Sequence, residues 1–463
     1  MKEVFKKLQT LRDLGKPSSP KVLIVEGPVN CNRNCSYCKV PKRWNKEKAS
    51  TVDQTCEQIN WGFDEGFRVL LYVGGETLAK CPRKNDIISE KHHMCPHGVK
   101  VYDSIVRQKE EPFRTKEGIT FEENTKRIIK HAHKKGFVTN VTTNGDFVDY
   151  PTIAGLKESG LDSLSFSVHS PNENSLARII SSARMAAKER IVPIVTVVFT
   201  KDRAEAIPKI AEMCAANGIL FSTALVQERG GGFSTVPKDP KESQIPTPEQ
   251  QKVVFDRLKK LKKKGYIRAN LKYLNNAPNF PDNSWKCNPD TNAFAHIRAT
   301  GNGKVGVCAE APLRFNVNKV HLKDEKWKET KKDFVDKCPG CLYGCNYESE
   351  NQDLKGDLRT FLNMLLIKTG QAGLVRFMGQ RSLGKKVSEV KPIPQSEQEK
   401  FQKEYKKEFK SIYSKAKRTV SYAVDFSINS TILTLFVVVG LIKGRSPKKS
   451  FKAYTIWRIL PGL

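Results

Sequence analysis

Two kinds of hydrophobic pattern alternate along the first part of the chain. Short apolar runs rich in β-branched residues are typical of buried strands, and stretches with apolar residues every three or four positions are typical of helices. Six strand–helix units follow one another in this way. The pattern predicts strands at 22–25, 69–73, 137–142, 163–168, 191–199 and 219–226, and helices at 52–65, 121–135, 152–159, 173–188, 206–217 and 248–264.

Repeated strand–helix units with parallel strands curl into a barrel or form an open sheet. We therefore predict an α/β fold over residues 20–270, preceded by a helical segment at 1–19. Ligands of such folds gather at the carboxyl ends of the strands. The residues that follow each strand are therefore the first candidates for chemistry.

The second unit is interrupted after Glu76 by about 40 residues, which is longer than an ordinary connection. This predicted insertion, at about 77–118, either binds a metal ion or packs over the active site. Its candidate ligands are Cys81, His92, His93, Cys95 and His97. Beyond the last helix we predict a small cysteine-rich region at 271–350 and a basic helical tail at 351–463.

Charge and cysteine content narrow the class of protein. The chain has 80 Lys and Arg against 49 Asp and Glu, a net charge of +31, and about half of the excess falls in residues 355–463. Such a surface suits anionic partners such as RNA, lipid headgroups or acidic substrates. The N-terminus lacks a secretory signal, so we expect a cytoplasmic protein whose twelve cysteines are metal ligands or buried thiols.

Three cysteines follow the first predicted strand in the run Cys-Asn-Arg-Asn-Cys-Ser-Tyr-Cys, at Cys31, Cys35 and Cys38. Three thiolates on a four-iron cluster leave one iron without a protein ligand, so that iron is free to bind a cofactor. The alternative is a zinc ion with a distant fourth ligand.

This run, with Tyr37 before its third cysteine, resembles the signature of the radical S-adenosylmethionine (SAM) superfamily. Gly74, Gly75 and Glu76 after the second strand are similar to that family's second motif, in which a glycine-rich strand end offers its backbone to the methionine amino group of SAM. Small residues permit this approach. Thr77 stands where family members commonly have proline.

Two later strand ends add to the resemblance. Thr143-Asn144-Gly145 resembles a triplet often seen in these barrels, and Ser167 falls where family members place a cofactor-binding serine. The alternatives are turn chemistry for Asn144 and an ordinary strand hydroxyl for Ser167. His169 either faces substrate or forms part of the pocket wall. The resemblance implies cofactor binding by Tyr37, Gly74, Gly75, Glu76, Asn144 and Ser167.

The resemblance also implies a partial (β/α)6 TIM-like barrel and a reaction. A [4Fe–4S] cluster, reduced by a donor such as ferredoxin or flavodoxin, cleaves SAM to a 5′-deoxyadenosyl radical that abstracts hydrogen from a substrate. We expect an oxygen-sensitive enzyme.

A second group of cysteines lies beyond the predicted barrel. The C-x15-G-x4-C spacing from Cys287 to Cys308 resembles the opening of a SPASM or twitch extension, which implies an auxiliary [4Fe–4S] cluster. Cys338, Cys341 and Cys345 depart from the full SPASM pattern and are too few for two complete clusters, and a structural zinc site is the alternative. Cys56 and Cys214 lie on predicted helices as core thiols.

The tail combines basic and apolar features. Phe401, Tyr405, Phe409 and Tyr413 recur every four residues among lysines, which suits an anionic membrane surface, RNA or packing on the barrel. The apolar stretch at 428–442 is shorter than the roughly 20 residues of a transmembrane helix, so we predict a membrane-associated anchor.

These features give four functional hypotheses. The first is a membrane-associated radical SAM enzyme acting on a lipid or isoprenoid, with the tail as its main support. The second is a peptide- or protein-modifying enzyme, and the third is an RNA-modifying enzyme that uses the basic surface as its nucleic-acid site. The fourth is a non-catalytic metal-binding membrane adaptor.

Overall fold

The computed structural model describes residues 20–28, 30–33, 35–39, 50–80, 119–169, 173–228, 236–282, 284–298, 304–311 and 314–383. All of them belong to one compact unit, Met1–Val387. The predicted helical segment at 1–19, nearly all of the insertion and the apolar stretch at 428–442 lie outside the described residues. What was predicted there stays a prediction.

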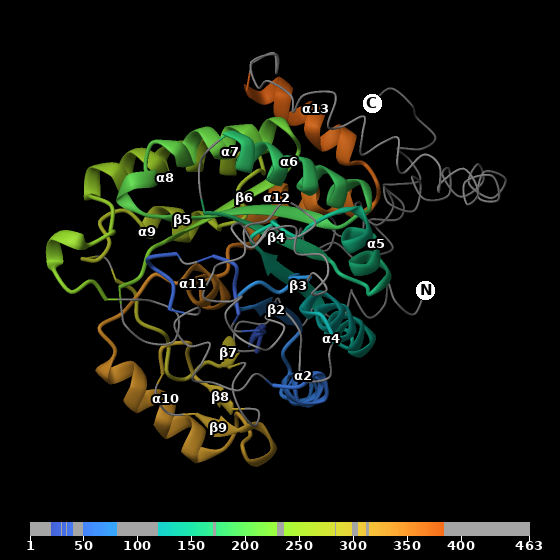
Figure 1. The fold of residues 1–463 in the computed structure, drawn as a ribbon. Helices are drawn as coiled ribbons and strands as arrows, with labels where there is room; N and C mark the ends of the chain where they lie inside the picture. The colour runs from blue at the N-terminus through green and yellow to red at the C-terminus, as the bar shows by residue number, and fades with distance from the viewer. Residues whose placement is uncertain are drawn as a thin grey trace, which may run out of the picture. The chain divides into compact units, whose positions relative to one another are not determined.

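Six parallel strands form the frame of the molecule (Figure 1). They are hydrogen-bonded in the order of the sequence, each to the next, as in a barrel that grows one strand–helix unit at a time. All six predicted strands are confirmed to within one residue at each end. They are β1 (Val22–Glu26), β2 (Val69–Val73), β3 (Val138–Thr143), β4 (Ser163–Val168), β5 (Val192–Phe199) and β6 (Leu220–Leu225).

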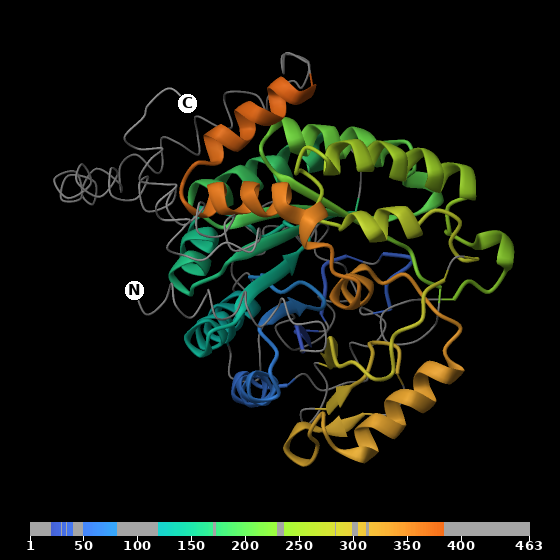
Figure 2. The same ribbon diagram turned by 180° about the vertical axis from the view of Figure 1, so that it is seen from behind.

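The predicted helices lie along the outer side of this curved sheet (Figures 1 and 2). Local sequence fixes their ends: Thr51 and Gln54 form a capping box before the first of them, and Gly136 ends the second in the left-handed conformation. The predictions are confirmed to within two residues at each end. The helices are α2 (Val52–Asp64), α4 (Phe121–Lys135), α5 (Tyr150–Glu158), α6 (Glu173–Lys188), α7 (Ala206–Ala216) and α8 (Pro248–Lys262).

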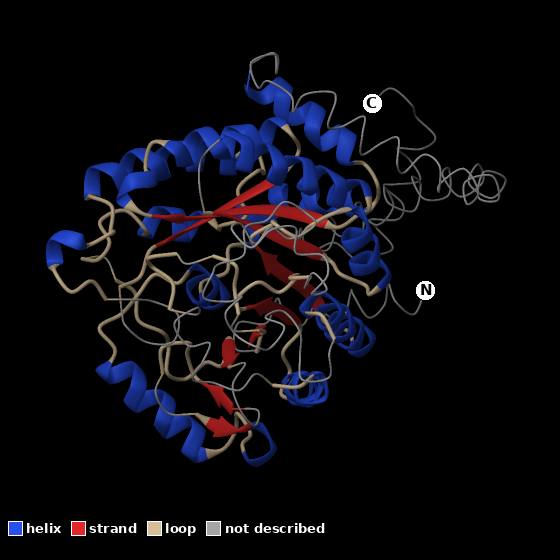
Figure 3. Ribbon diagram, in the orientation of Figure 1, coloured by secondary structure: helices blue, strands red, loops and turns tan. Residues whose placement is uncertain are grey.

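The cysteine-rich region continues the same sheet (Figure 3). Strand β7 (Phe294–Ile297) pairs in parallel with β1, and β8 (Lys304–Gly306) and β9 (Phe315–Asn316) follow as antiparallel neighbours. Strands β6 and β9 end the order of the described strands, so the sheet is open, as a partial barrel requires. The helices of this region are α9 (Leu271–Asn276), α10 (Glu325–Lys337) and α11 (Gly344–Glu350), and a 3₁₀ turn lies at Val317–Lys319. Two further 3₁₀ turns, Lys201–Arg203 and Pro240–Glu242, belong to the barrel.

The first part of the predicted tail packs on the barrel. Helices α12 (Leu354–Lys368) and α13 (Ala372–Leu383) contact α6, β5 and α7. The buried ammonium of Lys262 donates to Asp357 and Thr360 on α12, and the Tyr266 hydroxyl donates to the Val375 carbonyl at 2.8 Å. Among the described helices, none is both long enough and apolar enough to cross a bilayer.

Candidate active site

A pocket lies at the carboxyl ends of β1 to β4, where parallel sheets usually bind ligands. It brings together every residue predicted to hold the N-terminal cluster and its cofactor except Glu76. The lining residues are Cys31, Arg33, Cys35, Tyr37, Cys38, Gly74, Gly75, Thr142, Thr143, Asn144, Ser167 and His169.

Two cysteines of this pocket, Cys31 and Cys35, lie where burial disfavours the thiolate. Burial raises the pKa of Cys31 and of Cys35 above the ordinary value, and nearby Arg203 and Arg33 only partly offset this for Cys35. A thiol with a raised pKa is a poor nucleophile at neutral pH, whereas coordination to a metal deprotonates it outright. The donor set therefore fits an iron–sulfur cluster better than a nucleophilic cysteine.

His169 belongs to the wall that holds the cysteine loop. Its Nδ1 lies 3.2 Å from the Cys35 Sγ and 2.9 Å from the Tyr37 hydroxyl. Burial, followed by the positive charges of Arg33 and Arg203, lowers the pKa of His169 to about 4. The neutral ring therefore uses its Nδ1 to contact the loop with Cys35 and Tyr37, which favours His169 as part of the pocket wall over His169 as a substrate-facing group.

Arg203, which the sequence did not single out, positions this wall from the turn after β5. Its Nη2 donates to the His169 carbonyl at 2.9 Å, and its guanidinium lies 5.3 Å from the centre of the Tyr37 ring. A cation over an aromatic face and a charge-assisted hydrogen bond both restrain the loop.

The glycine pair after β2 allows the two strand ends to touch. A Cβ on Gly74 would lie 2.7 Å from the Pro28 carbonyl oxygen, and one on Gly75 would clash with the Asn30 backbone. The Gly75 N–H donates to Pro28 and the Glu76 N–H donates to Asn30 at 2.8 Å. Because these donors are used, what the motif can offer a bound amino group is its carbonyl oxygens.

Glu76 is fully buried and lies outside the pocket lining. Its carboxylate accepts from the Thr143 hydroxyl at 2.6 Å, the Asn144 N–H at 2.7 Å and the Leu78 N–H at 3.0 Å. Burial raises the pKa of Glu76 to about 7 against the opposing effect of these donors. The residue predicted to bind cofactor thus joins the ends of β2 and β3.

Asp146, just after β3, binds the loop that follows β1 and carries Cys31, Cys35 and Cys38, here called the cysteine loop. It accepts from Arg33 Nε and Nη2 at 2.7 and 2.6 Å, from Asn32 Nδ2 at 2.9 Å, and from Arg178 Nη2. Asn144 bonds to the same loop, since its Nδ2 donates to Asn32 Oδ1 at 2.7 Å and its Oδ1 accepts the Asp146 N–H. Sequence spacing gave no signal for the contacts of Asp146 and Asn144 with Asn32 and Arg33, which join residues more than 100 positions apart.

The later cysteines lie near one another, since Cys287, Cys338, Cys341 and Cys345 are each close enough to Cys308 to interact with it electrostatically. The backbones of Trp285 and Cys341 exchange two hydrogen bonds, which brings the strand before Cys287 against the later cysteines. Asn346 Nδ2 lies 3.9 Å from the Cys308 Sγ, and Tyr343 donates to Glu310.

Backbone donors point at two of these sulfurs. The Glu310 N–H donates to Cys308 at 3.5 Å and the Gly340 N–H to Cys338 at 3.4 Å. Burial raises the pKa of Cys308 to about 12 and that of Cys345 to about 11. Backbone N–H groups directed at buried thiols are what anionic cluster sulfurs require.

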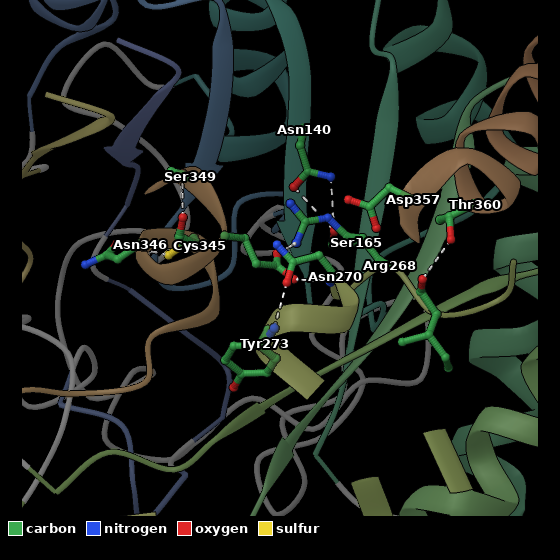
Figure 4. A network of polar contacts seen from close by, with 12 residues as sticks. Asn140, Ser165, Arg268, Asn270, Tyr273, Cys345, Asn346, Ser349, Asp357 and Thr360 are labelled. Carbon is green, nitrogen blue, oxygen red and sulfur yellow. Dashed lines mark hydrogen bonds and ion pairs between the residues drawn. The ribbon is translucent and has the colours of Figure 1, made fainter. Parts of the chain in front are cut away.

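A polar network links this region to the segment between α8 and α9, which pairs with β6 at Ile267 (Figure 4). The Glu348 carboxylate on α11 accepts from the Asn270 N–H at 2.7 Å and from Arg268 Nη1 at 3.3 Å. On the inner face of the sheet, Asn140 Nδ2 donates to the hydroxyls of Ser163 and Ser165. Parallel strands are usually apolar on both faces, so this polar interior suits a polar ligand.

Other predicted ligands fall elsewhere. Cys81, His92, His93, Cys95 and His97 lie outside the described residues. Cys214 is buried in α7 as predicted, and Cys56 on α2 is half-buried. Within the described ranges, no three Cys, His, Asp or Glu side chains lie close enough together to hold a metal ion.

One protein-family model matches part of this chain. The model of the Radical SAM superfamily matches residues 25–197, which span β1 to β5 and the whole pocket. No curated protein matches the chain.

Several solved structures are similar in fold. Streptococcus suis SuiB bound to precursor peptide SuiA is 15% identical over 71% of this chain and 70% of its own, with a TM-score of 0.46. Native anSMEcpe with bound AdoMet is 14% identical over 77% of this chain and 99% of its own, with a TM-score of 0.45. The FeFe-hydrogenase maturase HydG from Carboxydothermus hydrogenoformans is 12% identical over 85% and 83%, with a TM-score of 0.39.

The family match covers the strands that build the three-cysteine pocket, and residues 25–197 of this chain are therefore similar to the Radical SAM superfamily.

Proposed function

We propose that Cys31, Cys35 and Cys38 hold a [4Fe–4S] cluster and that SAM binds beside it in the same pocket. The observation that carries this proposal is that three partly buried cysteines share one pocket with a glycine pair. When bound, the cluster and SAM supply a one-electron cleavage that generates a 5′-deoxyadenosyl radical.

The chain's own groups divide the remaining work. Gly74 and Gly75 present backbone carbonyls to the amino group, and the Ser167 hydroxyl lines the opposite side of the pocket. Asn144 has one amide hydrogen left to donate to a ligand, because its other amide hydrogen bonds to Asn32 and its carbonyl oxygen accepts the Asp146 N–H. Arg203 and Asp146 keep the loop in place.

Anaerobic reconstitution tests this function. We expect the chain to bind about four iron atoms at the N-terminal site and to form 5′-deoxyadenosine with a reductant and SAM. Cys35→Ala should abolish product, whereas Cys56→Ala, which changes a half-buried thiol on α2, should not. Equal product from both variants would contradict the assignment.

We further propose an auxiliary [4Fe–4S] cluster ligated from the set Cys287, Cys308, Cys338, Cys341 and Cys345. The convergence of these cysteines around Cys308 and the N–H groups directed at their sulfurs support it. Iron and Mössbauer analysis of a Cys31/Cys35/Cys38→Ala variant tests it, because the N-terminal ligands are then absent. The same variant with Cys308→Ala added should lose the remaining iron, which assigns that iron to the later cysteines and not to Cys81 or Cys95. If the Cys31/Cys35/Cys38→Ala variant contains zinc and no iron, the result contradicts the auxiliary cluster and supports a structural zinc site instead.

The lipid or isoprenoid substrate is proposed on sequence alone, from the basic and apolar composition of the tail. Liposome flotation of the full chain and of a chain ending at residue 387 tests it with anionic and neutral vesicles. Binding of the full chain alone, to anionic vesicles, is expected from a basic anchor. If neither form binds, the peptide and RNA hypotheses take precedence.

A further inference from the structure

Helix α10 turns one lysine toward the second cysteine group. Two contacts fix the helix against residues 286–292: Trp327 Nε1 donates to Asn292 Oδ1 at 2.9 Å, and Lys286 Nζ donates to the Asp336 carbonyl at 3.3 Å. Lys331 lies between these contacts, one helical turn after Trp327. Its side chain is therefore on the face of α10 that covers Cys287.

The amino group of Lys331 is buried without a hydrogen-bond partner among the described residues. The residue is 3% exposed, and its Nζ has no hydrogen-bond partner in the part of the chain that the structure describes. Placing an unpaired ammonium away from water costs several kcal/mol, so such a group normally faces an anion. Burial lowers the pKa of Lys331, and Glu350, Cys287 and Asp290 are the neighbours that oppose this.

The neighbouring carboxylate is already occupied. Glu350 Oε2 accepts the Asn288 N–H at 2.7 Å and Oε1 accepts the Thr291 hydroxyl at 3.1 Å. As neutral thiols, the five cysteines supply no counter-charge. As ligands of an iron–sulfur cluster, they form an anionic group on the side that Lys331 faces.

We propose that Lys331 is a potential-setting residue, whose fixed positive charge raises the reduction potential of the auxiliary cluster. This inference rests on the auxiliary cluster proposed above. The reduced cluster carries one more negative charge than the oxidised cluster, so a nearby cation stabilises the reduced form more. Lys331 therefore makes the auxiliary cluster a better electron acceptor than its cysteines alone would.

The test uses the Cys31/Cys35/Cys38→Ala protein, in which the auxiliary cluster is the only one expected. Its midpoint potential is measured by redox titration with EPR detection, with Lys331 intact and in Lys331→Met. Methionine fills a similar volume without charge, and replacing a buried ion by an apolar residue is often tolerated. Lys332→Met, on the exposed side of the same helix, is the matched control.

We expect Lys331→Met to shift the midpoint to lower potential and Lys331→Arg to restore it. Glu350→Gln should shift it to higher potential, because a negative charge is removed, and Lys332→Met should leave it nearly unchanged through solvent screening. A fully loaded Lys331→Met protein with the potential of the Lys332→Met control overturns the inference. Failure of the parent protein to bind iron instead overturns the auxiliary cluster, and the inference with it.

Discussion

Asp146 accepts hydrogen bonds from both Nε and Nη2 along one edge of the Arg33 guanidinium, so the end of β3 holds the cysteine loop by a bidentate ion pair. The Asp146 side chain is only 5% exposed in this pair. Charge-assisted pairs of this geometry are stronger than neutral hydrogen bonds, and breaking a buried one leaves a charge uncompensated. The loop geometry therefore depends on a residue that ligates nothing.

We expect Asp146→Asn to lower both iron retention and 5′-deoxyadenosine formation, the latter by about tenfold or more for the loss of a charge-assisted pair. Iron analysis and product chromatography measure the two effects. Asp333→Asn, which removes an exposed partner of Lys337 on α10, should change neither. If the two variants behave alike, the clamp has no role in holding the loop.

Substitution of Gly75 should disturb the pocket through its backbone. An alanine there clashes with Asn30 in the cysteine loop, so we expect Gly75→Ala to cost roughly 1–3 kcal/mol of stability and most of the SAM cleavage. Gly373→Ala in α13 has no atom within 4 Å of the added methyl group and should be neutral or slightly stabilising. Urea unfolding of both variants tests this contrast, and equal midpoints would refute it.

Stability should depend on pH through Glu76. The folded pKa of about 7 lies above the ordinary 4.5, so folding favours the protonated carboxyl. This stabilisation is complete below about pH 4.5, is lost as the pH rises through 7, and amounts to about 3 kcal/mol. We compare urea unfolding of cluster-free wild type and Glu76→Gln between pH 5 and 8.

Wild type should lose more stability than Glu76→Gln over that range, although the variant is less stable overall because its amide mispairs with one N–H donor. Parallel pH profiles for the two proteins would show that the carboxyl of Glu76 keeps its ordinary pKa.

Helices α12 and α13 should be indispensable to the barrel. Ile367 and Val375 are fully buried, and Lys262 loses Asp357 and Thr360 when α12 is absent. We expect a chain ending at residue 387 to unfold cooperatively and a chain ending at 350 to be insoluble or to melt at a much lower temperature. Similar melting curves for both chains would place the barrel boundary before α12.

Local patterns account for how much of this structure was predictable. The β-branched runs gave all six barrel strands, and the contiguous cysteine loop and glycine pair gave one side of the pocket. The sequence did not predict the roles of Asp146, Arg203 and Lys331, because these roles come from contacts between distant parts of the chain that leave no pattern in residue spacing. Cofactor binding by Glu76 stays a prediction, and the hydrogen bonds that its buried carboxylate accepts from two backbone N–H groups and the Thr143 hydroxyl are visible only in three dimensions.

The direct pairing of β7 with β1 limits where this protein can be truncated. Strand β1 leads into the loop with Cys31, and β7 begins the hairpin that ends near Cys308, so one ladder of hydrogen bonds carries both cysteine-bearing segments. Removing the cysteine-rich extension would leave β1 as an exposed sheet edge, a site for aggregation. Grafting this extension onto another barrel would therefore have to include the strand beside it.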